Sequence, residues 1–77
     1  MDDIKKLDLR SLANFWGSSI VARCEIFRFT GGLISEKSLA NLDSAGKGPK
    51  GRMRIGRKIC YSTSSVIEWL ENRAELV

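Results

Sequence analysis

The feature that most constrains the fold is a pair of alternating segments around a glycine, between residues 52 and 61. Apolar and other residues alternate through Arg52–Ile55 and again from Lys58 to Tyr61, which is typical of strands because successive side chains point to opposite faces. Gly56-Arg57 stands between them as a two-residue turn with glycine first, which favours a tight hairpin. The sequence therefore predicts a β-hairpin in this region.

The alternation also predicts which hairpin residues face the core. We expect four side chains to point inward: Met53, Ile55, Ile59 and Tyr61. The cations Arg52, Arg54 and Lys58 are expected on the solvent face, with Arg57 at the tip.

Two short helices are predicted before the hairpin. The first covers residues 22–29, with Cys24, Phe27 and Ile26 as its inward positions, and Thr30-Gly31-Gly32 ends it. Ser35 can cap a second helix that runs to about Ser44, and a glycine at position 46 is typical of the residue after a helix end. This order resembles a helix-turn-helix.

A last helix follows the hairpin. Ser62 or Thr63 can cap it, and Trp69 is the expected centre of an apolar stripe that also contains Val66, Ile67 and Leu70. The predicted fold is therefore α+β and mostly α: a winged helix-turn-helix with three short helices and a two-stranded hairpin as the wing. A chain of 77 residues forms one domain at most.

The domain is expected to span residues 20–77. Residues 1–19 are expected to be a leader, either flexible or a short amphipathic helix, because apolar residues form an irregular stripe there: Ile4, Leu7, Leu9, Leu12, Phe15 and Trp16.

The charge distribution indicates a polyanionic partner. The net charge is +4, and five cations with no acid lie between Lys50 and Lys58. Short polar side chains near the start of the second helix suit contacts with base edges in a major groove. The candidate DNA-binding residues are Ser35, Lys37, Ser38, Asn41, Lys47, Lys50, Arg52, Arg54, Arg57 and Lys58. Two alternatives stay open: an ordinary solvated helix face, and cations that only protect a sheet edge from strand addition.

Other functional classes lack their usual residues. The chain has no histidine and two widely separated cysteines, so we expect no metal site, no cofactor and reduced thiols in a cytoplasmic protein. Cys24 is expected in the core, and Cys60 has no histidine to assist it as a nucleophile. The acids Glu25, Asp43, Glu68 and Glu71 are expected on the surface, so no enzyme activity or small-molecule substrate is predicted. No apolar run reaches the roughly 20 residues that cross a bilayer.

More than half of the chain resembles a known family. A glycine turn leads into SEKSLANLDSAGKGP, then RIGRKICY, then a helix that ends in WLE. In this order and spacing, residues 29–71 resemble the MerR-like winged-helix excisionases, also called recombination directionality factors. Many members of that family begin the last helix with proline or an acidic residue where this chain has Ser62 to Ser65, a difference that affects helix capping more than DNA contact.

The resemblance implies a role in bacterial DNA recombination. Such proteins bind arrays of sites beside an attachment site, bend the DNA, associate on it, and bias a tyrosine integrase towards excision of a mobile element. By position, Lys37, Ser38 and Asn41 would read bases, and the hairpin cations would form the wing. A transcription regulator of a mobile element would have the same DNA chemistry. A protein-interaction adaptor that docks through Leu12, Phe15 and Trp16 is a second alternative.

Overall fold

The predicted hairpin is present in the computed structural model, which describes residue 9 and residues 11–75. Its strands are β2 (Met53–Ile55) and β3 (Lys58–Ser62), joined by Gly56 and Arg57. Gly56 has a φ of 63°, a left-handed conformation that glycine adopts without steric cost. The glycine thus explains why the chain reverses at this point.

The sheet has three strands rather than the predicted two. Strand β1 (Ile20–Ala22) pairs antiparallel with β3, so that β3 is the central strand in the order β1-β3-β2. No local pattern in the sequence predicts this pairing, because its partners lie about forty residues apart. Val21 lies opposite Tyr61, and both side chains are fully buried.

The first predicted helix is shorter than expected, and different residues form its buried face. Residues 23–25 form the 3-10 turn η1 (Arg23–Glu25), and only α2 (Ile26–Phe29) is α-helical. Ile26 and Phe29 are the buried residues, whereas Phe27 and Cys24 are exposed. The expectation that Cys24 and Phe27 point inward was wrong, because the tighter winding of the 3-10 turn changes which positions share a face.

Helix α3 (Glu36–Ser44) has the predicted boundaries. The Ser35 hydroxyl accepts a hydrogen bond from the Ser38 amide at 3.0 Å, which satisfies one of the free amides of the first turn. At the other end the Gly46 amide donates to the Asp43 carbonyl, and the Lys47 amide donates to the Leu42 carbonyl. With Gly46 at a φ of 73°, these bonds form a Schellman motif that stops the helix.

Helix α4 (Thr63–Arg73) contributes more residues to the buried apolar cluster than any other described element. Ser62 caps it by accepting from the Ser65 amide at 3.1 Å. The predicted stripe of Val66, Ile67, Trp69 and Leu70 is buried, and burial of each such side chain contributes about 1.5–3 kcal/mol. The apolar face of α4 therefore packs against α1 and against strands β1 and β3.

Part of the predicted leader packs against this core. Helix α1 (Ser11–Trp16) places Leu12 and Trp16 on the core cluster. The rings of Trp16 and Phe29 pack edge to face, with their centroids 5.1 Å apart. Phe15 is 86% exposed. Ile4 and Leu7 of the predicted stripe lie outside the described residues.

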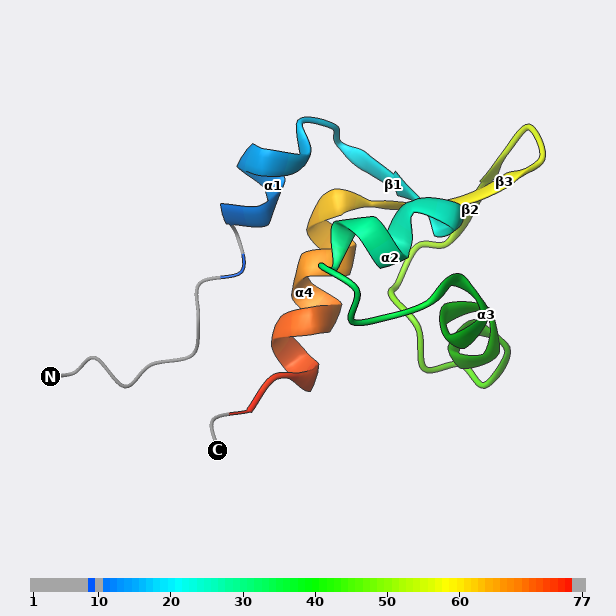
Figure 1. Cartoon of the computed structure of the whole chain (residues 1–77). Helices are drawn as coiled ribbons and strands as arrows, with labels where there is room; N and C mark the ends of the chain where they lie inside the picture. The colour runs from blue at the N-terminus through cyan, green and yellow to red at the C-terminus, as the bar shows by residue number, and fades with distance from the viewer. Residues whose placement is uncertain (1–8, 10, 76–77) are drawn as a thin grey trace, which may run out of the picture.

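The α+β class is confirmed. Across the described residues, four α-helices surround a small antiparallel sheet. Figure 1 shows α4 in the middle and α1 on the upper left. Helix α3 and the β2–β3 hairpin lie on the right.

Candidate nucleic-acid interface

Helix α3 presents a polar side to solvent. Lys37, Ser38 and Asn41 are exposed, whereas Leu39 and Asp43 are buried against the rest of the domain. Ser35 is also exposed, but its hydroxyl is engaged in the helix cap with Ser38. The helix is thus held by one side, which leaves the opposite side available to a partner.

The pairing of β2 with β3 divides the hairpin cations between two faces. Ile55 lies opposite Lys58, and Arg54 lies opposite Ile59; paired residues share a face of a sheet. Ile59 and Tyr61 alternate with Lys58 along β3, so Arg54 shares the face of Tyr61. Lys58 lies on the other face of the hairpin, together with Met53 and Ile55.

The prediction that Met53 and Ile55 share the inward face with Ile59 and Tyr61 was therefore wrong. Across a two-residue turn, an odd-numbered residue of one strand lies opposite an even-numbered residue of the other. Residues on the face of Ile59 and Tyr61 are therefore odd-numbered in β3 and even-numbered in β2. Consistent with this, Met53 is 39% and Ile55 is 50% exposed.

The face that carries Arg54 looks towards α3. The Tyr61 hydroxyl on this face reaches the Asp43 carboxylate of α3 at 2.5 Å, and an Arg52 nitrogen lies 3.8 Å from the same carboxylate. On the opposite face, the Lys58 ammonium group lies 3.7 Å from the Cys24 sulfur of η1. Arg52 and Arg54 thus stand on the side of α3, and Lys58 does not.

The connecting loop (residues 45–52) between α3 and β2 is fixed at several points. The Trp69 indole donates to the Lys47 carbonyl at 2.8 Å, and Pro49 is buried. A side chain at Gly48 would collide with the Asp43 carboxylate, so only glycine fits this position of the loop. The side chains of Lys47 and Lys50 remain exposed on this anchored loop.

Asp43 is the centre of a buried polar cluster with Arg23 and Tyr61. An Arg23 guanidinium nitrogen donates to the Asp43 carboxylate at 2.7 Å, and a second Arg23 nitrogen donates to the Tyr61 hydroxyl at 3.0 Å. The side chain of Asp43 is only 3% exposed. The expectation that Asp43 lies on the surface was wrong, because its partners are distant in sequence. The available signal in the sequence was the position of this acid within an otherwise apolar stripe of α3, which indicates a buried acid.

This cluster holds the hydroxyl of Tyr61 in its protonated form. Burial, and then the hydrogen bond to Asp43, raises the pKa of Tyr61 to about 12. The hydrogen bond to Tyr61 raises the pKa of Arg23, so Arg23 keeps its charge. Three groups from η1, α3 and β3 are thus joined in one charged network.

We expect the phenol of Tyr61 to ionise with a midpoint near pH 12 in the folded protein. The chain has one tyrosine, so phenolate absorbance in the near ultraviolet measures this group alone. The phenol of the unfolded chain loses its proton near pH 10. The stabilisation that this group contributes is therefore fully present below about pH 10 and is lost as the pH rises towards 12. The same titration in denaturant is the control. A folded midpoint near 10 would contradict the buried position of Tyr61.

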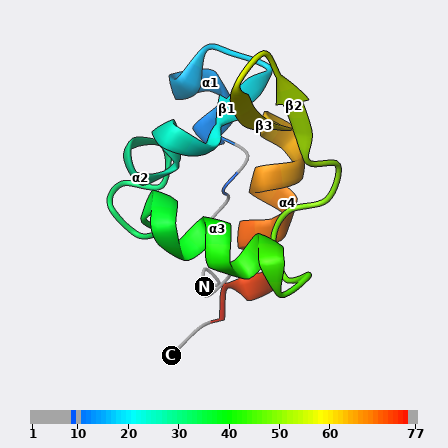
Figure 2. The same cartoon turned by 90° about the vertical axis from the view of Figure 1, so that its right-hand side faces the viewer.

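All ten sequence-predicted site residues are exposed. Figure 2, which views the molecule from the right-hand side of Figure 1, shows α3 across the front and the hairpin above it. Helix α3, the connecting loop and the hairpin tip with Arg57 therefore contribute to one side of the molecule. Lys58 departs from this grouping because it lies on the outer face of the hairpin.

The described residues contain no group of three or more potential metal ligands among histidine, cysteine, aspartate and glutamate. Cys24 and Cys60 are both free. None of the described helices has the length and apolar character needed to cross a membrane.

The comparisons with known proteins give no match: neither a protein-family model nor a curated protein is similar enough to this chain.

Proposed function

We propose that the chain is a winged helix-turn-helix module that binds duplex DNA. Helices α2 and α3, joined by the glycine turn, would form the helix-turn-helix, and the β2–β3 hairpin would be the wing. The observation that carries the proposal is the shared side of the molecule, where the polar side of α3 and the cations Arg54 and Arg57 are presented together. A nucleic acid groove flanked by phosphates fits such a surface.

In this proposal each element has its own part in binding. Lys37, Ser38 and Asn41 reach base edges from α3 in a major groove, where asparagine can pair with adenine through two hydrogen bonds. Arg57 enters the neighbouring minor groove, whose negative potential attracts arginine. Lys47 and Lys50 contact phosphates from the connecting loop. The buried acid Asp43 does not oppose them, because Arg23 pairs with its charge.

The biological role that we propose is that of an excisionase acting on DNA in a bacterial cytoplasm. The resemblance of residues 29–71 to MerR-like excisionases supports it, with a tyrosine integrase as the protein partner. A single module of this kind buries only about 600–1,000 Å² of its surface on DNA. Several copies would therefore bind tandem sites side by side. A transcription regulator would differ only in where these sites lie.

Binding of the intact chain to a random duplex at low and moderate salt tests the DNA proposal directly. Fluorescence anisotropy is expected to show binding that weakens linearly in a plot of log affinity against log salt. Absence of binding at low salt would contradict the proposal and favour a protein-interaction adaptor. Footprinting at an attachment site and at nearby promoters then separates an excisionase from a regulator.

Asn41→Ala is expected to reduce discrimination between a selected duplex and its scrambled version by about 1–3 kcal/mol, the value of a bidentate base contact. The selected duplex comes from rounds of binding to a random pool. Asn72→Ala is the matched control, because Asn72 is an exposed asparagine near the far end of α4. An equal loss of affinity for both duplexes would show that Asn41 does not read a base.

A further inference from the structure

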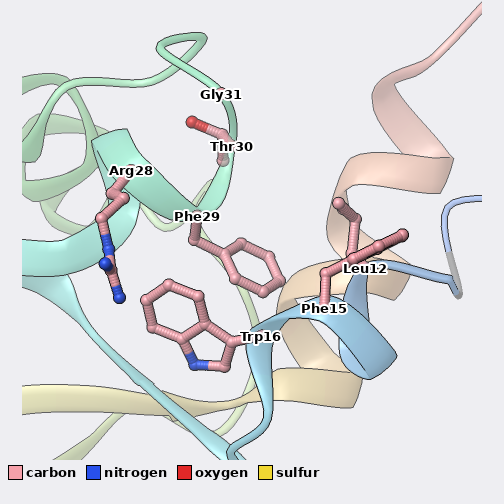
Figure 3. A pocket seen from close by; sticks show the side chains of 7 residues that line it. All are labelled: Leu12, Phe15, Trp16, Arg28, Phe29, Thr30 and Gly31. Atoms are coloured by element: carbon pink, nitrogen blue, oxygen red, sulfur yellow. The ribbon is translucent and has the colours of Figure 1, made fainter.

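A groove of about 450 Å³ lies between α1 and α2, and residues 28–31 form part of its lining. Figure 3 shows its apolar lining, formed by Leu12, Phe15, Trp16 and Phe29. Arg28 is the charged residue of the lining. The groove uses none of the residues that the DNA proposal assigns to nucleic acid.

The polar groups around the groove are engaged within the domain, apart from the end of Arg28. The Trp16 indole donates to the Ile20 carbonyl at 2.9 Å. The Thr30 hydroxyl donates to the Ile26 carbonyl and accepts from the Ile34 amide. An occupant therefore meets apolar surface and edges of aromatic rings, with its polar recognition left to Arg28.

Arg28 is placed to recognise an anion at the rim. Its guanidinium lies over the Trp16 ring, 5.0 Å from the ring centroid. Its Nε atom lies 3.3 Å from a Glu25 carboxylate oxygen, while the Arg28 side chain stays 77% exposed. A guanidinium has five N–H donors in a planar fork, so the ion pair through Nε leaves the terminal nitrogens directed to solvent. A carboxylate is the natural complement to that fork.

Phe15 indicates that the occupant is a macromolecule. Its ring is 86% exposed, although aromatic side chains of this size gain the most from burial. It stands on a short helix whose other large apolar residues, Leu12 and Trp16, already pack on the core. An exposed aromatic ring beside an apolar groove is typical of a protein interaction site.

We propose that this groove binds a segment of a partner protein that presents a tryptophan or leucine side chain next to a carboxylate. The apolar side chain lies between Phe15 and Phe29, and the carboxylate pairs with Arg28. Because the groove lining includes none of the residues that the DNA proposal assigns to nucleic acid, the partner can bind whether or not DNA is held. The proposal does not depend on DNA binding.

The test uses two synthetic peptides on the intact chain. One combines glutamate with leucine and tryptophan, and the other replaces each glutamate with lysine. Nuclear magnetic resonance titration should show the acidic peptide shifting the Trp16 indole and Gly31 amide signals. It should bind about fivefold tighter than the basic peptide, the most that an exposed ion pair usually contributes. Arg28→Glu should reverse this preference, and Phe15→Ser should weaken binding of both peptides.

Arg54→Gln combined with Arg57→Gln is the control for the basic side of the molecule and should leave the groove signals unchanged. Loss of acidic-peptide binding in this control, with none in Arg28→Glu, would place the peptide on the hairpin and overturn the proposal. Failure of both peptides to bind would also overturn it. If Phe15→Ser instead removes a concentration-dependent change in sedimentation, the groove belongs to a second copy of this chain.

Discussion

Replacing Asp43 with asparagine is expected to lower the free energy of unfolding by about 3 kcal/mol, because it removes one partner of a buried charged cluster. Removal of one partner usually costs 3–5 kcal/mol. The low end applies because the Arg23 side chain is 20% exposed and can regain some hydration. For a domain of this size the melting temperature should fall by roughly 12–24 °C. Thermal unfolding followed by circular dichroism measures this change.

The control for lost negative charge is Glu68→Gln, because Glu68 is an exposed acid on α4. Its effect should stay within about 0.5 kcal/mol. Asp43→Asn and Tyr61→Phe should also be strongly non-additive, since the two side chains share one hydrogen bond. An asparagine variant as stable as the unaltered protein would mean that Asp43 is not a buried ion-pair partner.

The Asp43 cluster connects the two elements that the DNA proposal needs. Asp43 belongs to α3, Tyr61 to the central strand, and Arg23 to η1 at the end of β1. A base-reading helix must keep its position relative to a wing to within a fraction of an ångström. The cluster supplies that positioning from inside the domain, while Arg52 extends it to the strand that enters the hairpin.

Local signals in the sequence predicted most of the secondary structure. The serine caps of α3 and α4, the Schellman glycine at position 46 and the glycine turn at position 56 each act within a few residues. Their effect could therefore be read without tertiary information. The core stripe of α4 followed from helical periodicity in the same way.

The features that the sequence did not reveal depend on contacts between distant segments. Pairing of β1 with β3 joins Val21 to Tyr61, and η1 winds tightly enough to expose Cys24. The ten candidate residues are exposed, which their charge and polarity alone favour. Their division between hairpin faces required the register of the sheet. The Arg23–Asp43–Tyr61 cluster required the packing of three elements.

The division of the cations between the two faces of the hairpin leads to the largest functional effect that we predict. Replacing both Arg54 and Arg57 with glutamine should weaken duplex binding by about 150-fold or more, since a hydrogen bond to a charged group contributes about 1.5–3 kcal/mol and two are lost. If both arginines contact phosphates, the slope of log affinity against log salt should also fall by roughly 1.8. Fluorescence anisotropy across a salt series measures both quantities.

The matched control removes two other positive charges, through Lys58→Gln and Arg28→Gln. Lys58 lies on the hairpin face away from α3, beside Cys24, and Arg28 lies at the groove between α1 and α2. Long-range attraction to DNA depends on net charge, which both double variants change equally. Contact with phosphates depends on position, which differs between them. Equal weakening by the two variants would show that net charge alone drives binding, and the hairpin would then have no specific place in the interface.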